Sequence, residues 1–328
     1  ISPDVIVARA DYDIDQELCT KIALFCGVPE QAVIPLTTTS VTYEVPLLLE
    51  ERNLGNYLVE KLQLHDKHKS ADWSEWNKMI KSVYKQADTL QIAVVGKYIE
   101  LEDAYISVKE ALRHAGSSQG HNIDITWIQS SNLDVSNSND LLQNCDGVIV
   151  PGGFGERGVE GKISAAHWAR TNQVPYLGLC LGMQVMCIEF ARHLLGISDA
   201  NSTEFNRDTT NPIIDLMPNQ RNISEMGGTM RLGVYPCVLI DGTRAAEAYG
   251  TSHNSRVSER HRHRFEFNNK YREVFTENNM VFSGLSPDEE LVEIAELTDH
   301  PFMLGSQFHP EFLSRPNRPH PLFSAFVK

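Results

Sequence analysis

Cys180 lies in the stretch LGLCLGMQ (177–184), with Gly178 and Gly182 two residues away on either side. The stretch has the pattern of a strand that turns abruptly into a helix, and glycines there let the backbone pack closely around a strained turn. The N-terminus of the following helix would stabilise a thiolate. The pattern favours a cysteine nucleophile over a buried structural cysteine, which is the commoner role of an arbitrary cysteine.

The segment QFHPEF (307–312) offers a base for that thiol. It ends an expected strand and presents His309 and Glu311 at positions i and i+2. The carboxylate can therefore bind the second ring nitrogen and fix the tautomer and orientation of the imidazole. The alternative is that His309 merely ends a strand and that Glu311 is a solvated surface acid.

A glycine-rich loop, VPGGFGERG (150–158), follows another expected strand. The backbone N–H groups of such a loop are free to point outward. The N–H groups of Gly153 and of Leu181, just after the nucleophile, would form an oxyanion hole for a tetrahedral intermediate. A phosphate-binding loop is the competing interpretation, and it is disfavoured because the Lys-Ser/Thr ending of a Walker A motif is missing.

The elements around these residues alternate between strand and helix patterns. We expect strands at 90–98, 122–129, 145–153, 175–180, 291–297 and 302–309, and helices at 102–116 (ended by Gly116), 158–172 and 181–194. This order predicts an α/β fold with a doubly wound, parallel or mixed sheet flanked by helices. Ligands bind at the carboxyl ends of such strands, so the glycine-rich loop and Cys180 should lie at the same edge.

The first part of the chain shows the same alternation of strand and helix patterns over a shorter stretch. Expected strands at 3–9 and 32–36 enclose a helix at 13–27, and about 65 residues are too few for an ordinary α/β domain. We therefore predict a partial α/β segment at 1–65, a linker helix within 66–89 and a catalytic domain at 90–328. Because the first residue is Ile, we expect a fragment or a processed product.

Composition narrows the class of protein. The net charge of −14 argues against a nucleic-acid-binding or anionic-membrane scaffold, and no apolar run reaches the ~18 residues of a membrane span. The six cysteines form no CxxC pair, which disfavours a zinc ribbon or a redox dithiol and indicates a reducing cytoplasm. His261 and His263 are a weak metal signal without an obvious third ligand, so we predict no metal site.

Six segments in order carry a family resemblance: PGGFGERG, GLCLGMQ, NSTEF, GGTMRLG, ERHRHRFEFN and QFHPEF. They resemble the glutaminase part of the CTP synthase family, a class I (triad) glutamine amidotransferase, over about residues 90–328. The resemblance implies that Cys180 attacks the side-chain amide carbon of L-glutamine. It implies that His309 passes the proton to the departing ammonia and then activates water against the thioester, while Glu311 orients His309.

The same resemblance implies the residues that bind glutamine. Besides Gly153 and Leu181 they are Gln184, Glu204 for the α-ammonium and Arg264 for the α-carboxylate. The chemistry agrees, because one acid and one base select a zwitterion and arginine binds carboxylates bidentately. The alternatives are that Glu204 caps a helix and that RHRHR is a solvated strand face.

The resemblance also implies partners beyond glutamine. In this family ammonia reaches an amidoligase domain that uses ATP and Mg²⁺ to phosphorylate UTP and aminate it to CTP, GTP activates the enzyme, and the subunits form homo-tetramers. Residues 1–65 are similar to the end of that domain. There Lys21 aligns with a nucleotide-binding lysine, whereas LTTTSVTYEVP departs from the family pattern. Arg157 is a candidate for the response to GTP.

No GxxxxGK[ST] sequence occurs, so we expect the chain as given to hydrolyse glutamine but not to make CTP. Two other functions remain open. One is another Cys-His-Glu hydrolase, such as a γ-glutamyl hydrolase, which NSTEF and RHRHR disfavour. The other is an idle regulatory or assembly module, which the intact triad disfavours.

Overall fold

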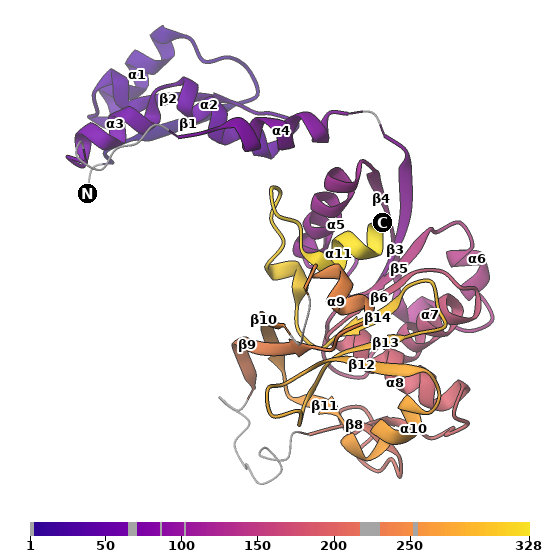
Figure 1. Ribbon diagram of the computed structural model, residues 1–328. Coiled ribbons are helices and arrows are strands. Elements are labelled where there is room, and N and C mark those ends of the chain that lie inside the picture. Colours follow the sequence, from indigo (N-terminus) through magenta and orange to yellow (C-terminus); the bar gives the residue numbers. More distant parts are fainter. Residues whose placement is uncertain (1–2, 65–70, 86, 102, 217–229, 252–254) are drawn as a thin grey trace. The chain divides into compact units, whose positions relative to one another are not determined.

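The computed structural model describes residues 3–64, 71–85, 87–101, 103–216, 230–251 and 255–328. The chain forms two compact units, Ile1–Lys85 and Gln86–Lys328, and each is described here by itself (Figure 1). The helix expected within 66–89 is α4 (Ser74–Val83), which belongs to the first unit. Residues 66–70 and 86 of the expected linker lie outside the described residues.

The first unit has the expected strand–helix–strand order. β1 (Ile6–Ala10) pairs in parallel with β2 (Val33–Thr37), and α1 (Gln16–Cys26) connects them. Asp15 caps α1 by accepting a hydrogen bond from the Leu18 N–H (2.8 Å), and Gly27 ends it at φ 66°. The described residues of this unit also contain α2 (Val45–Glu51), α3 (Leu54–Lys61), α4 and the 3₁₀ turns η1 (Glu30–Ala32) and η2 (Thr42–Glu44).

The second unit is built on a mixed sheet, and the predicted fold class is confirmed. Among the described residues nine strands form this sheet, in the order β10 (Arg256–His263), β9 (Arg231–Leu239), β12 (Met280–Leu285), β13 (Val292–Leu297), β14 (Met303–Ser306), β6 (Tyr176–Leu179), β5 (Gly147–Val150), β3 (Thr89–Gly96) and β4 (Asn122–Gln129). The strands from β14 to β4 are parallel, and the others pair antiparallel.

Helices cover both faces of the parallel part (Figure 1). α5 (Ile106–Gln119) and α11 (Pro321–Val327) lie on one face, and α7 (Val159–Thr171) and α8 (Leu181–His193) on the other. The side chains of β5 explain this, because successive residues of a strand point to opposite faces. Val148 and Val150 belong to the core under α7 and α8, whereas Ile149 belongs to the core under α5 and α11. A strand buried on both faces reads as a continuous apolar run.

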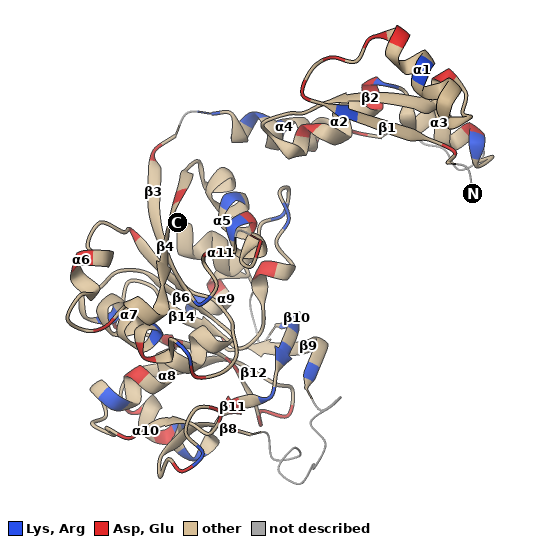
Figure 2. Cartoon of the chain, turned by 180° about the vertical axis from the view of Figure 1, so that it is seen from behind, with Lys and Arg blue, Asp and Glu red and all other residues tan. Residues whose placement is uncertain are grey.

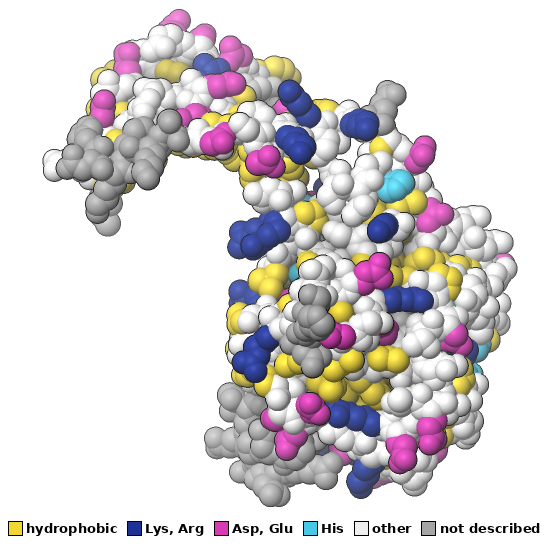
Figure 3. All heavy atoms as spheres, in the orientation of Figure 1, with side chains coloured by type: hydrophobic (Ala, Val, Ile, Leu, Met, Phe, Trp, Pro, Cys, Tyr) yellow, Lys and Arg dark blue, Asp and Glu magenta, His cyan; other side chains and the backbone are white. Residues whose placement is uncertain are grey.

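Smaller elements complete the second unit. They are a three-stranded sheet of β11 (Phe265–Phe267), β8 (Pro212–Leu216) and β7 (Asn201–Ser202), the helices α6 (Ser138–Leu142), α9 (Arg244–Ala248) and α10 (Arg272–Thr276), and the 3₁₀ turns η4 (Ser130–Asn132), η6 (Asn269–Tyr271) and η7 (Pro310–Phe312). Figure 3 shows acidic and basic side chains interspersed on the visible face of this unit. No helix in the described ranges is long and apolar enough to cross a bilayer.

The predicted end of α5 at Gly116 is wrong. The helix continues to Gln119, and Gly120 ends it in the left-handed conformation at φ 81°. Gly116 is inside the helix because there is no room for a side chain: an added Cβ would lie 2.5 Å from Cγ1 of Ile123. A glycine required by packing was mistaken for a helix stop.

Three neighbouring parallel strands end at one edge of the sheet. Gly178 of β6 pairs with Val150 of β5, and Leu179 of β6 pairs with Ser306 of β14. The residues that follow these strands are the glycine-rich loop, Cys180 and the segment from Gln307. The fold therefore brings all three sequence motifs to the carboxyl edge of adjacent strands, as was predicted for the glycine-rich loop and Cys180.

Candidate active site

Cys180 occupies a strained turn between β6 and α8. It is the N-cap residue of α8, with φ 51° and ψ −100°, and its side chain is buried. Such a backbone conformation is costly for a residue other than glycine and is typical of functional turns. The flanking glycines are needed for space: a Cβ on Gly178 would lie 2.5 Å from the carbonyl carbon of Gly182, and a Cβ on Gly182 would lie 2.0 Å from the oxygen of Val150.

His309 joins Cys180 to Glu311. Its Nδ1 is 2.7 Å from Oε1 of Glu311, and its imidazole hydrogen-bonds to the Cys180 side chain. Burial alone would lower the pKa of His309, but the negative charge of the Cys180 thiolate and the bond to Glu311 outweigh it and raise that pKa to about 10. The three residues therefore form a continuous Cys–His–Glu chain, with the imidazole between the sulfur and the carboxylate.

The glycine-rich loop lies beside this chain. A Cβ on Gly152 would be 2.8 Å from Cε1 of His309 and 3.5 Å from Cβ of Cys180, so only glycine fits between them. Among the described residues the N–H groups of Gly153 and Leu181 donate to no protein acceptor. Both amides are thus available for the oxyanion of a tetrahedral intermediate.

Gln307 is a neighbour of the thiol that sequence reasoning missed. Its Nε2 lies 3.6 Å from Sγ of Cys180. Gln184 in turn donates from its Nε2 to Oε1 of Gln307 (3.2 Å) and to the carbonyl of Phe265 (3.0 Å). Gln184 therefore holds Gln307 toward the sulfur. The available signal was the i, i+2 spacing of Gln307 and His309 after β14.

Glu204 contacts the glycine-rich loop, and Arg264 lies within electrostatic range of Glu204. Oε1 of Glu204 accepts a hydrogen bond from the N–H of Gly155 (2.8 Å). Burial raises the pKa of Glu204, while this hydrogen bond and the positive charges of Lys97, Arg264 and Lys162 oppose that rise. An acid and a base of the predicted glutamine set are therefore within electrostatic range of each other near the loop.

A pocket opens at the same edge. Its wall contains Gly152 and Gly153 of the loop, all three members of the Cys–His–Glu chain and residues at the start of α5. The full set is Ala104, Tyr105, Ser107, Val108, Pro151, Gly152, Gly153, Phe154, Cys180, Arg262, His309, Glu311 and Phe312. Arg262 lies over the Phe154 ring at 5.7 Å. Within the described part of the chain, this wall does not include Gln184, Glu204 or Arg264.

Comparison with known families identifies the family to which the chain belongs. The profile of class I glutamine amidotransferases matches residues 100–328, and the profile of the CTP synthase N-terminus matches residues 1–64. The chain belongs to the class I glutamine amidotransferase family.

Individual relatives assign this amidotransferase to the CTP synthase branch. CTP synthases of Chloroflexus aurantiacus and Dehalococcoides mccartyi are 57% and 54% identical over 327 residues, which are 100% of this chain and 59% of each relative. The chain thus spans about three-fifths of the length of these curated relatives. The glutaminase domain of Trypanosoma brucei CTPS, with bound acivicin, is similar with a TM-score of 0.68 and 39% identity over 72% of this chain and 92% of that domain.

The two histidines that raised a metal hypothesis lie in a buried charge network of this amidotransferase. His261 and His263 hydrogen-bond to each other (2.9 Å). Arg231 lies between two carboxylates, 2.6 Å from Glu293 and 3.5 Å from Glu266. Burial and the charge of Arg231 lower the pKa of His261 to about 2 and of His263 to about 3. Arg231 supplies the cation of this network, and Figure 2 marks the basic residues of β9 and β10 in blue.

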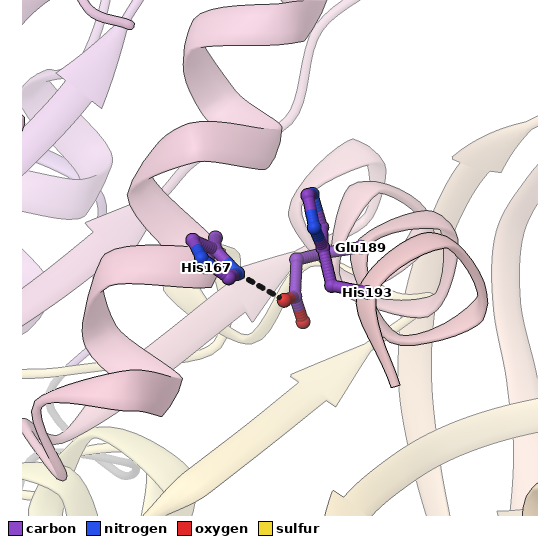
Figure 4. A group of neighbouring side chains, drawn as sticks. All are labelled: His167, Glu189 and His193. Atoms are coloured by element: carbon purple, nitrogen blue, oxygen red, sulfur yellow. Dashed lines mark hydrogen bonds and ion pairs between the residues drawn. The ribbon is translucent and has the colours of Figure 1, made fainter. Parts of the chain in front are cut away.

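A second His–Glu cluster lies between α7 and α8, away from the sheet edge. His167, Glu189 and His193 have possible ligand atoms within 4.8 Å of one another (Figure 4). However, Arg170 already binds both oxygens of Glu189, at 2.8 and 2.9 Å, and His167 is 2.8 Å from the same carboxylate. A metal ion would have to compete with this guanidinium, so the cluster is best explained as a structural ion pair.

The two residues predicted to contact nucleotides are both exposed. Lys21 lies on α1 in the first unit, where its ammonium is 2.6 Å from Glu17. Arg157 lies in the loop after β5, where it stacks over the Tyr98 ring at 5.3 Å and approaches the carbonyl of Lys97 (3.5 Å). Nothing in these contacts tests a nucleotide role, and both assignments stay predictions.

Proposed function

We propose that this chain hydrolyses L-glutamine to glutamate and ammonia through Cys180, His309 and Glu311. The observation that carries the proposal is the hydrogen-bonded chain from Cys180 through His309 to Glu311. The thiolate attacks the side-chain amide carbon, and the carbonyl oxygen becomes an oxyanion bound by the N–H groups of Gly153 and Leu181. The imidazolium then donates its proton to the leaving nitrogen, which departs as ammonia and leaves a thioester.

The second half of the reaction uses the same groups in reverse. Neutral His309 takes a proton from water, and the resulting hydroxide attacks the thioester carbon. The second tetrahedral intermediate collapses to glutamate, and the sulfur leaves as thiolate beside the imidazolium. Glu311 holds Nδ1 of His309 throughout, so that the nitrogen facing Cys180 exchanges the proton.

Recognition of glutamine would come from opposite charges beside the loop. Glu204 would bind the α-ammonium and Arg264 the α-carboxylate, because their charges already lie within electrostatic range of each other. Gln184 would act through Gln307, which it contacts, as well as through any direct contact with glutamine.

The wider activity of the protein is also a proposal. We infer that the ammonia serves the amination of UTP to CTP, with ATP and Mg²⁺ as cofactors, GTP as activator and a homo-oligomeric assembly. Support comes from the named relatives, whose additional length this chain does not cover. Lys21 and Arg157 remain the candidates for nucleotide contacts. A cytoplasmic location is supported by six cysteines that are all free thiols.

The direct test is hydrolysis of glutamine by this chain, compared with hydrolysis of γ-glutamyl peptides and asparagine, with GTP present or absent. Ammonia release reports the side-chain amides, and glutamate release reports glutamine and the γ-glutamyl peptides. We expect hydrolysis of free glutamine and its loss in Cys180→Ala. Preference for γ-glutamyl peptides would indicate a γ-glutamyl hydrolase instead. Failure to hydrolyse either substrate, with or without GTP, would contradict the proposal and favour a regulatory module.

A further inference from the structure

Lys162 is a buried cation that the steps above do not use. It lies on α7, is 1% exposed, and is among the largest fully buried side chains. Its Nζ points at the glycine-rich loop, 3.3 Å from the position that a Cβ on Gly153 would occupy. Within the described part of the chain this ammonium donates no hydrogen bond and forms no close ion pair. The free-energy cost of burying its charge must therefore be offset by charges at longer range.

Two anions and one cation face this ammonium from three other elements. Cys180 at the start of α8 and Glu204 after β7 attract it, and Lys97 after β3 repels it. Burial first, and then the charge of Lys97, lower the pKa of Lys162 to about 8, against the attraction of Cys180 and Glu204. The ammonium is therefore present at neutral pH and is lost on moderate alkalinisation, well below the pKa of about 10 for His309.

We infer that Lys162 is a positioning residue for the glutaminase, which acts by its charge from behind Gly153 to favour negative charge on Cys180 and on the oxyanion. The inference rests on the proposed function. No contact with the substrate is required, because a cation in a site that excludes water acts over several ångströms. A buried lysine that served packing alone would offer the same stem volume but would not need its charge.

The first experiment separates charge from volume with Lys162→Met, which keeps the length of the side chain and removes the ammonium. Replacing a buried charge by an apolar side chain of similar size usually preserves or raises stability, so we expect an unchanged or higher Tm. We expect kcat at pH 7.5 to fall about tenfold, with KM within about twofold. Lys270→Met removes the same charge from an exposed position and should leave both constants unchanged.

The pH profile of kcat carries the sharper readout. Wild-type kcat at saturating glutamine should decline as pH rises through about 8, where Lys162 loses its proton. Lys162→Met should lack this limb and stay flat up to the deprotonation of His309 near 10. The amino group of glutamine titrates equally in both assays, so the difference isolates Lys162. Profiles of the same shape in the two proteins would overturn the inference.

Alkylation of Cys180 tests the role of Lys162 without glutamine turnover. It can therefore fail or succeed independently of the proposed glutaminase activity. The rate of Cys180 alkylation by iodoacetamide, followed by peptide mass spectrometry, reports the availability of the thiolate. In Lys162→Met the pH of half-maximal alkylation should rise by about one unit, a tenfold change in the thiolate equilibrium. An unchanged midpoint would overturn the charge role even if glutamine hydrolysis is observed. A raised midpoint would sustain that role even in a chain that releases no ammonia.

Discussion

Two histidine–carboxylate pairs in this molecule have almost the same geometry and different surroundings. Nδ1 of His309 is 2.7 Å from Glu311, and Nδ1 of His167 is 2.8 Å from Glu189. Both carboxylates are buried. The first pair lies at the carboxyl edge of the sheet and continues to a thiol. The second pair lies between two helices (Figure 4). It shares its carboxylate with the guanidinium of Arg170.

The difference indicates that the group bound to a His–carboxylate pair decides what the pair can do. That group is the Cys180 thiol in the first pair and the Arg170 guanidinium in the second. At the sheet edge the carboxylate orients His309, and the imidazole can exchange a proton with Cys180. Between the helices Arg170 binds both oxygens of Glu189. Burial would raise the pKa of Glu189, yet its bonds to His167 and Arg170 lower it below the ordinary value. That pair is expected to contribute stability and no catalysis.

The largest expected effect comes from the thiol itself. Cys180→Ala should reduce glutamine hydrolysis by at least about 10⁴-fold, because no other group can form the thioester. Cys187→Ala, two helical turns along α8, is the matched control: this thiol is fully buried and burial raises its pKa. The control should keep kcat within about twofold and lose about 1 kcal/mol of unfolding free energy. Comparable activity in the two variants would refute the assignment of Cys180.

The next effect compares the two carboxylates directly. Glu311→Gln should lower kcat about 10²-fold with little change in the free energy of unfolding, because His309 loses the group that fixes its tautomer. Glu189→Gln should do the reverse, with kcat within about threefold and a stability loss of about 2 kcal/mol from a disrupted buried ion pair. Steady-state kinetics and urea denaturation of both variants measure this contrast. An equal fall of kcat in the two variants would contradict the different roles of Glu311 and Glu189.

A smaller effect is expected at the binding step. Arg264→Ala should raise KM for glutamine about tenfold and change kcat much less, since it removes a bond to the α-carboxylate that persists through the reaction. Arg256→Ala, at the exposed start of β10, which ends just before Arg264, is the control for a lost surface charge. A defect confined to kcat would count against the binding role of Arg264.

The smallest effect concerns the acid dependence of stability. Because the folded-state pKa of Glu189 is lowered, its contribution is present above the unfolded value of 4.5 and is lost as pH falls through the folded value. Between about pH 6 and pH 3, the free energy of unfolding should therefore fall less steeply with decreasing pH in Glu189→Gln than in the wild type. Urea denaturation at a series of pH values measures this dependence. The same pH dependence of the free energy of unfolding in both proteins would mean that the pKa of Glu189 does not differ between the folded and unfolded states.

The parts of the site that depend on the order of the strands and on short spacings between residues could be predicted from the sequence. Cys180 and the glycine-rich loop had to share an edge because their strands are parallel neighbours, and the i, i+2 spacing of His309 and Glu311 put the carboxylate within reach of the ring. Strand–helix alternation likewise predicted the parallel half of the sheet and the covering helices.

What sequence reasoning missed depends on side-chain direction and close packing. Gln307 and Lys162 carry no motif, and only the folded arrangement turns them toward Cys180 and Gly153. The sequence did not indicate that the amide nitrogen of Gln184 binds Gln307 and the carbonyl of Phe265, and its predicted contact with the substrate stays a prediction. Gly116 was assigned to a helix end by its type, although contact with Ile123 is what requires it.

The most direct test of the central claim is the site of reaction of a glutamine analogue that carries an electrophilic carbon at the amide position. Cys180 is 3% exposed, whereas Cys26 lies on the surface, so simple accessibility and activation by His309 predict different products. Peptide mass spectrometry should find the adduct on Cys180, and free glutamine should suppress it. Labelling of Cys26 with Cys180 unmodified would contradict the account.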